Sequence, residues 1–533
     1  MDHPRDKIGT VEDMLARFGK ARARRGNWET MWQQAYDYTM PAKEQFRTSH
    51  QKGEYRRERI YDSTAVNAVP KFATRIMAAL TPSWSNWAKL SLGPEIDDDA
   101  ELGVDPQEWP QYAELTPQEA VELISEKFFH FLHHSNFAQQ AFEAYQDLAV
   151  STLSMTMDWR DGGFIFQAIP LSQCFLEEGP SGSVQTQWRE LDVAVRNLQQ
   201  TWPGLQMSVD LEAKLRESPA DTVTCVEGVI YAPGRNPADL GSYHLVVIDK
   251  ERGHLLLHVD HGESSPCLTA PWSRAAGEVY GRGPVILTLG DILTANKMME
   301  HKLRGDAFAV LGLWTGVSDG VFNPFTARFV PGSVISVASN DNANPSLRPL
   351  PLGGAPQIVD VDLQDLRRNI ERALFANPLG EVTETPVRTL GENMMRMQDM
   401  LEQAGASFGL LEREFAAAIV KRGIFLMSRE GVIPPLRVDG QAVTIEFTSP
   451  LAQARDTQEL QGVQLFAQTM GLLSPEEAPF LLKPSEAAEY VRERVGVPKR
   501  MVRTEDEVQQ IIAQRMQAMA AAQGQQGPGG MGA

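Results

Sequence analysis

The sequence predicts an α+β fold that is mainly helical and divides into several packed units. Its 533 residues exceed the size that one hydrophobic core normally serves. Hydrophobic residues make up 42% of the chain and charged residues 22%, proportions typical of a globular protein. Apolar residues recur at helical spacing in several long segments, whereas strand-length apolar runs occupy the middle. Helices should therefore frame a central mixed region.

The first predicted helix begins near residue 11, and Pro41 ends its pattern. Its apolar residues recur at about 3.6-residue spacing. They are Val11, Met14, Leu15, Phe18, Trp28, Met31 and Trp32. The basic residues between them are Lys20, Arg22, Arg24 and Arg25. A solvated basic face is the preferred interpretation of these residues, and a nucleic-acid contact is the alternative.

A second helix should begin at Asp62 or Ser63, either of which can cap it, and end before Pro82. Pro70 lies inside this segment, which predicts a kink or a later start. A strand-like segment follows at residues 89–92.

Residues 164–259 predict mixed α and β structure, because short apolar runs alternate there with glycine and proline. The runs are FIFQAIP from Phe164, YHLVVID from Tyr243 and HLLLHVD from His254. The last two are joined across KERG and predict a hairpin.

Two further helices are predicted around a β-rich stretch. The first follows Pro284, with Leu289, Ile292, Leu293, Met299 and Leu303 on one face. The second resumes near Gln357, with Leu363, Leu366, Ile370 and Ala373 on one face. Between them, residues 305–354 are rich in glycine, proline, serine and asparagine, and the runs FAVLGLW, RFV and SVISV predict short strands.

The strongest periodic signal lies beyond Pro386 and predicts one long helix. Steps of four and three residues alternate through Leu390, Met394, Met397, Leu401, Ala404, Phe408, Leu411, Phe415 and Ala418. Gly405 and Gly409 weaken its middle, and Gly431 and Pro434 should end it. A strand, VTIEF, and short helices through residue 519 should follow, and residues 521–533 should be flexible.

Composition narrows the possible functions. The formal net charge of −19 does not suit tight binding of duplex DNA, although it suits a protein past which DNA must slide. The cysteines, Cys174, Cys225 and Cys267, have no CxxC spacing and predict reduced thiols. No apolar run reaches the roughly 18 residues that span a bilayer, and we expect neither a signal peptide nor membrane insertion.

Catalytic and metal motifs are missing from the sequence. It has no GxxxxGK[ST] phosphate loop, no HExxH and no GxSxG. Asp97–Asp99 should form a solvated loop, and His130, His133 and His134 a half-buried helix face. His254, His258, His261 and Cys267 could be drawn as a zinc site, but a strand would hold the first two about 13 Å apart. We therefore expect no enzyme, metal or cofactor, and keep as alternatives a DNA-processing enzyme such as a nuclease and a small-ligand binding protein.

Several short sequence motifs together resemble those of the head-to-tail connector, or portal, family of short-tailed bacteriophages. They stand in the family's order from about residue 10 to about residue 460. They are the Arg-rich helix leading to Trp28 and Tyr36, YDSTA from Tyr61, LTPSWSNW from Leu80, YGRGP from Tyr280 with LGDILTAN, ETPVRTLGE from Glu384, GVIPP and SPLAQAR from Ser449. Pro70 and Ala88 depart from the family's usual pattern.

The resemblance implies a structural ring, usually of twelve subunits, around a central channel. Its regions would be a wing (1–284), a first stem helix (285–304), a clip (305–355), a second stem helix (356–376), a tunnel loop (377–387), a long helix returning to the wing (388–449), a crown (450–520) and a tail (521–533). The apolar faces of the long helix and the stem helices should be covered by neighbouring copies.

The resemblance also implies partners and a place. The partners are further copies of the chain, major capsid and scaffolding proteins, terminase, tail adaptor proteins and double-stranded DNA bound without sequence specificity. The ring would sit at a capsid vertex of the virion after assembly in the host cytoplasm.

Candidate DNA-facing residues lie on the two predicted stem helices. They are Lys297, Lys302, Arg304, Arg367, Arg368 and Arg372. Pairing within one helix, such as Arg367 with Glu371, is an equally good interpretation of these charges. The predicted tunnel loop comprises Asn377, Pro378, Leu379, Gly380, Glu381, Val382, Thr383 and Glu384. Its carboxylates would repel phosphate, and Leu379 with Val382 would form an apolar collar.

Overall fold

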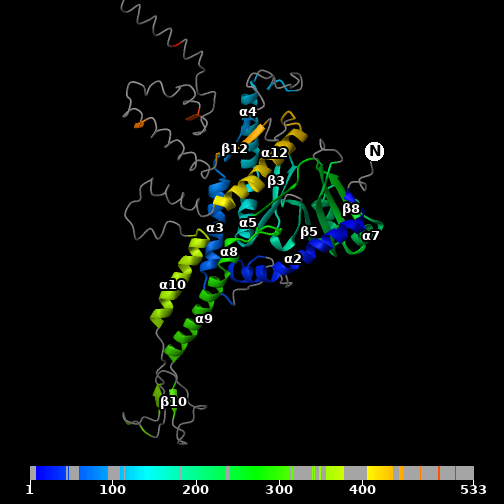
Figure 1. Ribbon diagram of the computed structural model, residues 1–533. Coiled ribbons are helices and arrows are strands. Elements are labelled where there is room, and N and C mark those ends of the chain that lie inside the picture. Colours follow the sequence, from blue (N-terminus) through cyan, green and yellow to red (C-terminus); the bar gives the residue numbers. More distant parts are fainter. Residues whose placement is uncertain are drawn as a thin grey trace, which may run out of the picture.

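The computed structural model shows an α+β protein in which a helical and β-sheet body carries a projecting pair of helices (Figure 1). It describes residues 8–43, 59–93, 115–179, 182–234, 241–311, 356–376 and 405–435, with shorter stretches at 109–112, 314–316, 347–349, 443–448, 468–469 and 490–491 and a few single positions. The predicted fold class, α+β and mainly helical, is confirmed.

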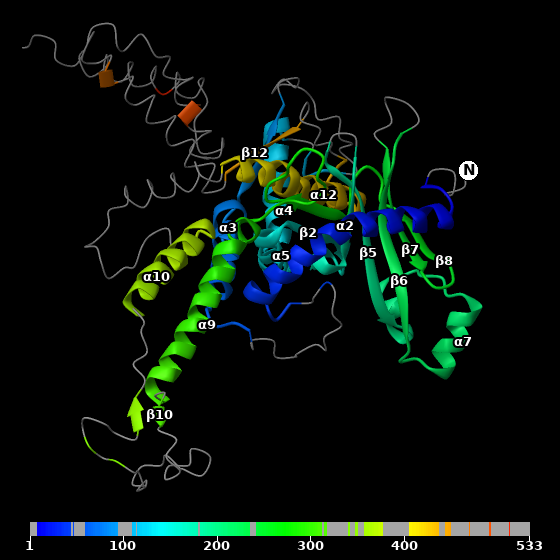
Figure 2. The same ribbon diagram turned by 60° about the horizontal axis from the view of Figure 1, so that its bottom comes forward.

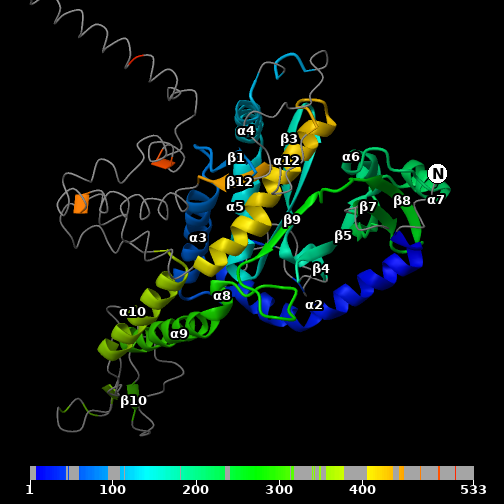
Figure 3. The ribbon, with the colours of Figure 1, turned by 45° about the horizontal axis from the view of Figure 1, so that its top comes forward.

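The N-terminal helix α2 (Val11–Thr39) has the predicted bounds. A capping box fixes its start, because the Thr10 hydroxyl accepts from the Asp13 amide at 3.2 Å while the Asp13 carboxylate accepts from the Thr10 amide at 3.1 Å. The helix runs from the helical body to the larger sheet (Figures 2 and 3). It therefore joins the two halves of the body.

Helix α3 (Thr64–Leu80) continues through Pro70, so the prediction of a late start is wrong. The Asp62 carboxylate accepts from the Thr64 amide at 2.9 Å, whereas Ser63 makes no side-chain cap. Proline removes a single backbone donor, and the buried face around Phe72 and Ile76 holds the helix against α5 (Phe137–Val150). Packing therefore outweighs the local preference for a break.

Two antiparallel sheets form the rest of the body. The smaller has the order β3 (Gly163–Ala168), β2 (Thr152–Arg160), β9 (Cys267–Pro271). The larger has the order β4 (Cys174–Glu178), β5 (Val184–Ala194), β6 (Thr222–Ala232), β7 (Ser242–Asp249), β8 (His254–Asp260). The predicted hairpin between β7 and β8 is confirmed.

Short helices and a further strand pair complete the body. One face of the larger sheet packs on α2, and the other packs partly on α6 (Leu198–Thr201) and α7 (Val209–Glu217). Helix α4 (Pro117–His133) contacts β1 (Ala88–Leu92), which pairs antiparallel with β12 (Val443–Phe447). This pair confirms two predicted strands and joins distant parts of the chain.

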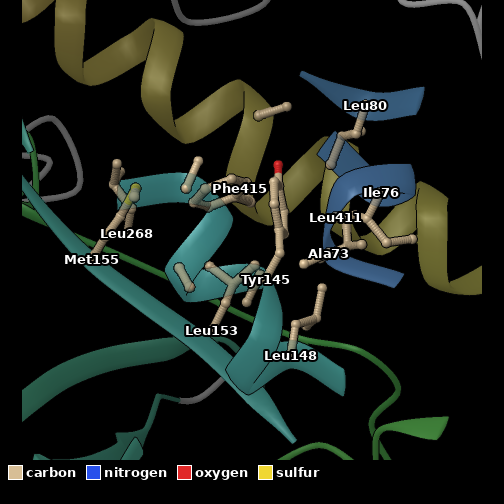
Figure 4. Close-up of a cluster of buried hydrophobic side chains, with 14 of the residues drawn as sticks. Ala73, Ile76, Leu80, Tyr145, Leu148, Leu153, Met155, Leu268, Leu411 and Phe415 are labelled. Atoms are coloured by element: carbon tan, nitrogen blue, oxygen red, sulfur yellow. The ribbon is translucent and has the colours of Figure 1, made fainter. Parts of the chain in front are cut away.

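The main core lies where α3, α5 and the smaller sheet meet the helix of residues 405–429 (Figure 4). Ile76 comes from α3, Leu148 from α5 and Leu153 from β2, and Leu411 and Phe415 come from the helix of residues 405–429 (Figure 4). Each is fully buried, and burying such a side chain stabilises the fold by about 1.5 to 3 kcal/mol.

The described part of the predicted long helix runs from residue 405 through a π-turn (Glu412–Ala416) into α12 (Ala417–Arg429). Phe408 and Phe415 are buried as predicted, but the π-turn adds a residue, so Ile419 is buried where Ala418 was expected. This part of the seam packs within its own subunit, and the expectation that neighbouring copies cover it is wrong here. Residues 388–404 lie outside the described part of the chain.

The projecting pair consists of α9 (Leu289–Leu311), which follows the short α8 (Pro284–Leu287), and α10 (Pro356–Ala373). The two helices lie side by side, with β10 (Trp314–Gly316) paired antiparallel to β11 (Leu347–Pro349) at the far end (Figure 1). Helix α9 extends beyond the expected end at Arg304, so most of the run FAVLGLW is helical and the strand prediction is wrong there. A short apolar run fits either a helix or a strand, and here residues 308–311 continue helix α9.

Candidate functional site

The six candidate basic residues lie on the projecting pair, three on α9 and three on α10. The two helices carry these six cations against seven carboxylates, so their combined formal charge is close to zero. Such a surface attracts a polyanion only weakly, since retention of DNA depends on an excess of clustered cations. The surface can therefore touch phosphate without holding it tightly.

On α9, Glu300 organises the basic residues. Its carboxylate accepts from Lys297 Nζ at 2.7 Å and pairs with Arg304 Nη2 at 2.5 Å. The hydrogen bond from Lys297 is the largest cause of the lowered pKa of Glu300, and the charge of Arg304 adds to it. Lys302 instead reaches across to Asp360 and ties α9 to α10.

On α10, Arg367 makes an ion pair that leaves the helix. Its Nε donates to Asp62 Oδ2 at 2.8 Å, and the Asp62 side chain is only 4% exposed. Intrahelical pairing with Glu371, the sequence-based alternative, is therefore not the ion pair found for Arg367. Arg368 does pair within the helix, with Asp365 at 3.4 Å, where both side chains are largely exposed.

Asp62 and Asn296 form a junction between α3, α9 and α10. The Asn296 Oδ1 accepts from the amides of Tyr61 and Asp62 at 2.7 and 3.1 Å, and its Nδ2 donates to the Arg59 carbonyl at 3.0 Å. Burial alone would raise the pKa of Asp62, but the hydrogen bonds from Thr64 and Arg367 outweigh it and lower that pKa. The junction fixes where the projecting pair leaves the body.

Exposure divides the six candidates. Lys297, Arg304, Arg368 and Arg372 are exposed, whereas Lys302 and Arg367 are half-buried in pairs that hold elements together. The first four could therefore meet a polyanion without breaking a contact between helices. All eight predicted tunnel-loop residues, from Asn377 to Glu384, lie outside the described part of the chain.

The sequence analysis did not predict that two arginines, Arg25 and Arg422, are buried. Arg25 was expected on a solvated face, but it is 4% exposed and donates to the carbonyls of Leu171, Ser172 and Cys174. Arg422 is 1% exposed and donates to the carbonyls of Met157 and Ser264. Arg25 follows Phe18 and Ala21 at helical spacing on the apolar face of α2, and this position could have indicated its burial.

The other expected histidine and cysteine residues are dispersed. His258 bonds His244 at 3.2 Å and His261 bonds Arg422 at 3.1 Å, and no group of three metal-ligating side chains converges among the described residues. His130, His133 and His134 are exposed, not half-buried as expected, because they lie at the end of α4. Asp97–Asp99 lie outside the described residues.

The cysteines are free thiols, as the sequence predicted. Burial raises the pKa of both Cys174 and Cys225 to about 12, and burial also raises that of Cys267. At neutral pH all three are therefore protonated and poor nucleophiles.

One serine and histidine pair bears on the enzyme alternative. Ser242 Oγ lies 2.8 Å from His244 Nε2, but Asp260 is 3.9 Å from the other ring nitrogen, beyond a hydrogen bond. The pair thus lacks the carboxylate bond that orients the base of a catalytic triad.

None of the described helices combines the length and the apolar character needed to cross a membrane.

Comparison with known proteins accounts for the chain as a whole. A sequence model of the family described as bacteriophage head to tail connecting protein matches residues 11–502. The "Probable portal protein" of Bordetella phage BPP-1 is 21% identical over 546 residues, and the "Portal protein" of Salmonella phage epsilon15 is 22% identical over 536 residues. Each alignment covers 96% of this chain and 92% of the phage protein. The resemblance read from the sequence is confirmed: the chain belongs to the bacteriophage head to tail connecting protein family.

Proposed function

We propose that the chain is a subunit of a twelve-membered ring at one capsid vertex, through whose channel double-stranded DNA is packaged and ejected. The projecting α9 and α10 pair carries the proposal. It presents apolar side chains that its own chain leaves exposed, Leu303 at 45% and Val361 at 60%, and Leu287 at its base is 69% exposed. Covering these side chains with a neighbouring copy would remove apolar surface from water, which favours association in a ring.

The proposed subunit would divide into the regions that the family resemblance implies. Residues 1–284 would form the wing, α9 and α10 the stem, and the residues between them, with β10 and β11, the clip. Residues 377–387 would form the tunnel loop, 388–449 the long helix and its return to the wing, and 450–520 the crown. The extension of α9 to Leu311 lengthens the proposed stem beyond residue 304.

The exposed cations would line part of the channel. Lys297, Arg304, Arg368 and Arg372 are accessible, and the nearby carboxylates keep the attraction for phosphate weak. DNA could then contact the wall at many places and still slide.

The role would be structural and not catalytic. The ring would dock terminase during packaging and tail adaptor proteins afterwards, within a shell of major capsid protein assembled with scaffolding protein. The family membership and the names of the two phage relatives support this role.

Charge reversal tests the channel assignment. Arg368→Glu combined with Arg372→Glu should leave ring assembly intact and reduce the amount of DNA packaged several-fold, because repulsion replaces attraction at each subunit. Arg216→Glu, on the exposed face of α7 and away from the projecting pair, is the matched control. Unchanged packaging in the double variant would remove these two residues from the channel wall.

A further inference from the structure

A cavity of about 560 Å³ lies between the two sheets, since residues of both sheets line it. The larger sheet lies on the side of the body away from the projecting pair (Figure 3). One wall comes from β2 and β3 and includes Ile165 and Phe166. The opposite wall comes from β5, β6 and β7 and includes Leu191, Val229 and Leu245. Most of the lining is apolar, and the volume lies in the range of about 300 to 1,000 Å³ that is common for small-molecule sites.

Strand register shows which residues form the wall on the larger sheet. Arg189 faces Glu227 and Val229 faces Leu245 across neighbouring strands, so these residues share one face of the larger sheet. The residues that alternate with them, such as Trp188 and Val226, point the other way and pack under α2. Helices α6 and α7 cover only part of the open face.

Arg189 brings a buried positive charge to the cavity, whose lining also includes the Glu227 carboxylate. It is 8% exposed, and its Nε donates to Gln173 Oε1 at 3.1 Å. The terminal amino groups of this guanidinium find no partner among the described residues. Glu227, directly across the strand pair, accepts instead from Trp202 Nε1 at 2.6 Å. A buried guanidinium in this position favours an anion.

His261 adds a hydrogen-bond donor to the same cavity. Arg422 Nη2 donates to its Nδ1 at 3.1 Å, and because a guanidinium only donates, the ring proton must lie on Nε2. Burial first and Arg422 second lower the pKa of His261 to about 4, so the ring is neutral at pH 7. This Nε2 is buried and has no hydrogen-bond partner within the described structure.

The remaining charges at the cavity do not cancel this preference. Asp158 lies 3.9 Å from Arg422 and 4.0 Å from Arg429, so two cations already face its carboxylate. Arg160 also lines the cavity and is exposed. With Arg422 and Arg429 counted, four arginines stand around the cavity against the two carboxylates that line it, Asp158 and Glu227, so positive charge is in excess.

We propose that this cavity binds a small organic anion, whose carboxylate or phosphate group is held by Arg189 and whose apolar part packs on Leu191, Val229 and Leu245, while His261 Nε2 donates to an acceptor elsewhere in the cavity. The site lies apart from the projecting pair and is independent of the proposed channel. Charge and hydrogen bonding would select the head group, and the two sheet faces would exclude water from the rest.

Two fluorescent probes of nearly the same apolar shape test the proposal on the full-length protein. Anilinonaphthalene sulfonate carries an anion, and phenylnaphthylamine does not. The anionic probe should bind at least about tenfold more tightly, because a charge-assisted hydrogen bond is formed only with the sulfonate. Arg189→Met should abolish that preference, whereas Arg196→Met, at an exposed position outside the cavity, should leave it unchanged.

A second variant covers the case in which Arg189→Met fails to fold. Leu245→Trp fills the cavity from its half-buried wall and should weaken both probes at least about tenfold while Arg189 stays in place. Equal affinity of the wild-type protein for the two probes would overturn the proposal, because Arg189 would then bind only water and not the anionic group. Unchanged binding by a folded Arg189→Met or Leu245→Trp variant would overturn it as well.

Discussion

Replacing Asp62 by asparagine should loosen the junction that holds the projecting pair. The amide keeps an oxygen for the Thr64 amide, but it sets an NH₂ group against Arg367 Nε, which now lies 2.8 Å from a carboxylate oxygen. Breaking a buried ion pair costs about 3 to 5 kcal/mol. The Arg367 side chain is 37% exposed, so water recovers part of this cost and about 2 to 3 kcal/mol remains.

Hydrogen exchange at the start of α3 measures this loss locally, since a protein of several packed units has no single unfolding transition. The Asn67 amide, which bonds the Ser63 carbonyl at 3.0 Å, should exchange roughly 30- to 150-fold faster in Asp62→Asn. A double-mutant cycle with Arg367→Gln should give a coupling energy of about 1 to 2 kcal/mol.

Arg368→Gln is the matched control for the cycle. Arg368 pairs with Asp365 at the surface, where side chains 72% and 63% exposed gain little, so exchange should change by less than about threefold. Exchange in Asp62→Asn no faster than in this control, or a coupling energy near zero, would refute the view that the Asp62 and Arg367 pair holds the junction.

The remaining predictions concern acid, a buried arginine and the thiols. The pKa of Asp62 is lowered in the folded protein, so its contribution to stability is fully present above the ordinary value of about 3.9 and is lost as pH falls below that value. Asp62→Asn should therefore reduce the acid-induced increase in hydrogen exchange at the start of α3. Arg25→Ala removes three charge-assisted hydrogen bonds to carbonyls and should lower the free energy of local opening of α2, measured by hydrogen exchange, by about 3 kcal/mol, whereas the exposed Arg24→Ala should lower it by under about 0.5; equal effects would contradict the burial argument. Native protein at pH 8 should resist alkylation of Cys174 and Cys225 by iodoacetamide until denaturant exposes them, and mass spectrometry that found rapid labelling would contradict their burial and raised pKa.

Spacing of apolar residues was sufficient to predict much of the fold. The bounds of α2, the start of α10 near Gln357 and the β7 and β8 hairpin all follow from local pattern and turn residues. Local rules failed where tertiary packing opposed them. Pro70 stays inside α3 because the helix is buried along one face. The end of α9 was predicted too early because the short apolar run after Gly305 has no clear period and fits either a helix or a strand.

The candidate site was predictable only in part. The pairing of Lys297 with Glu300 follows from spacing along a helix. The partner of Arg367 lies 305 residues away in sequence, and no local pattern could identify it. Buried Arg25 and Arg422 were missed for a related reason, since their partners are mostly backbone carbonyls that only the folded chain brings into position.

Electron microscopy of the purified full-length protein tests the central claim most directly. The proposal predicts closed rings, twelve-fold in end-on views, with the α9 and α10 pairs of successive subunits packed around a central channel and Leu303 and Val361 buried between them. A particle that stays monomeric at every salt and protein concentration, with the projecting pair free in solution, would contradict it.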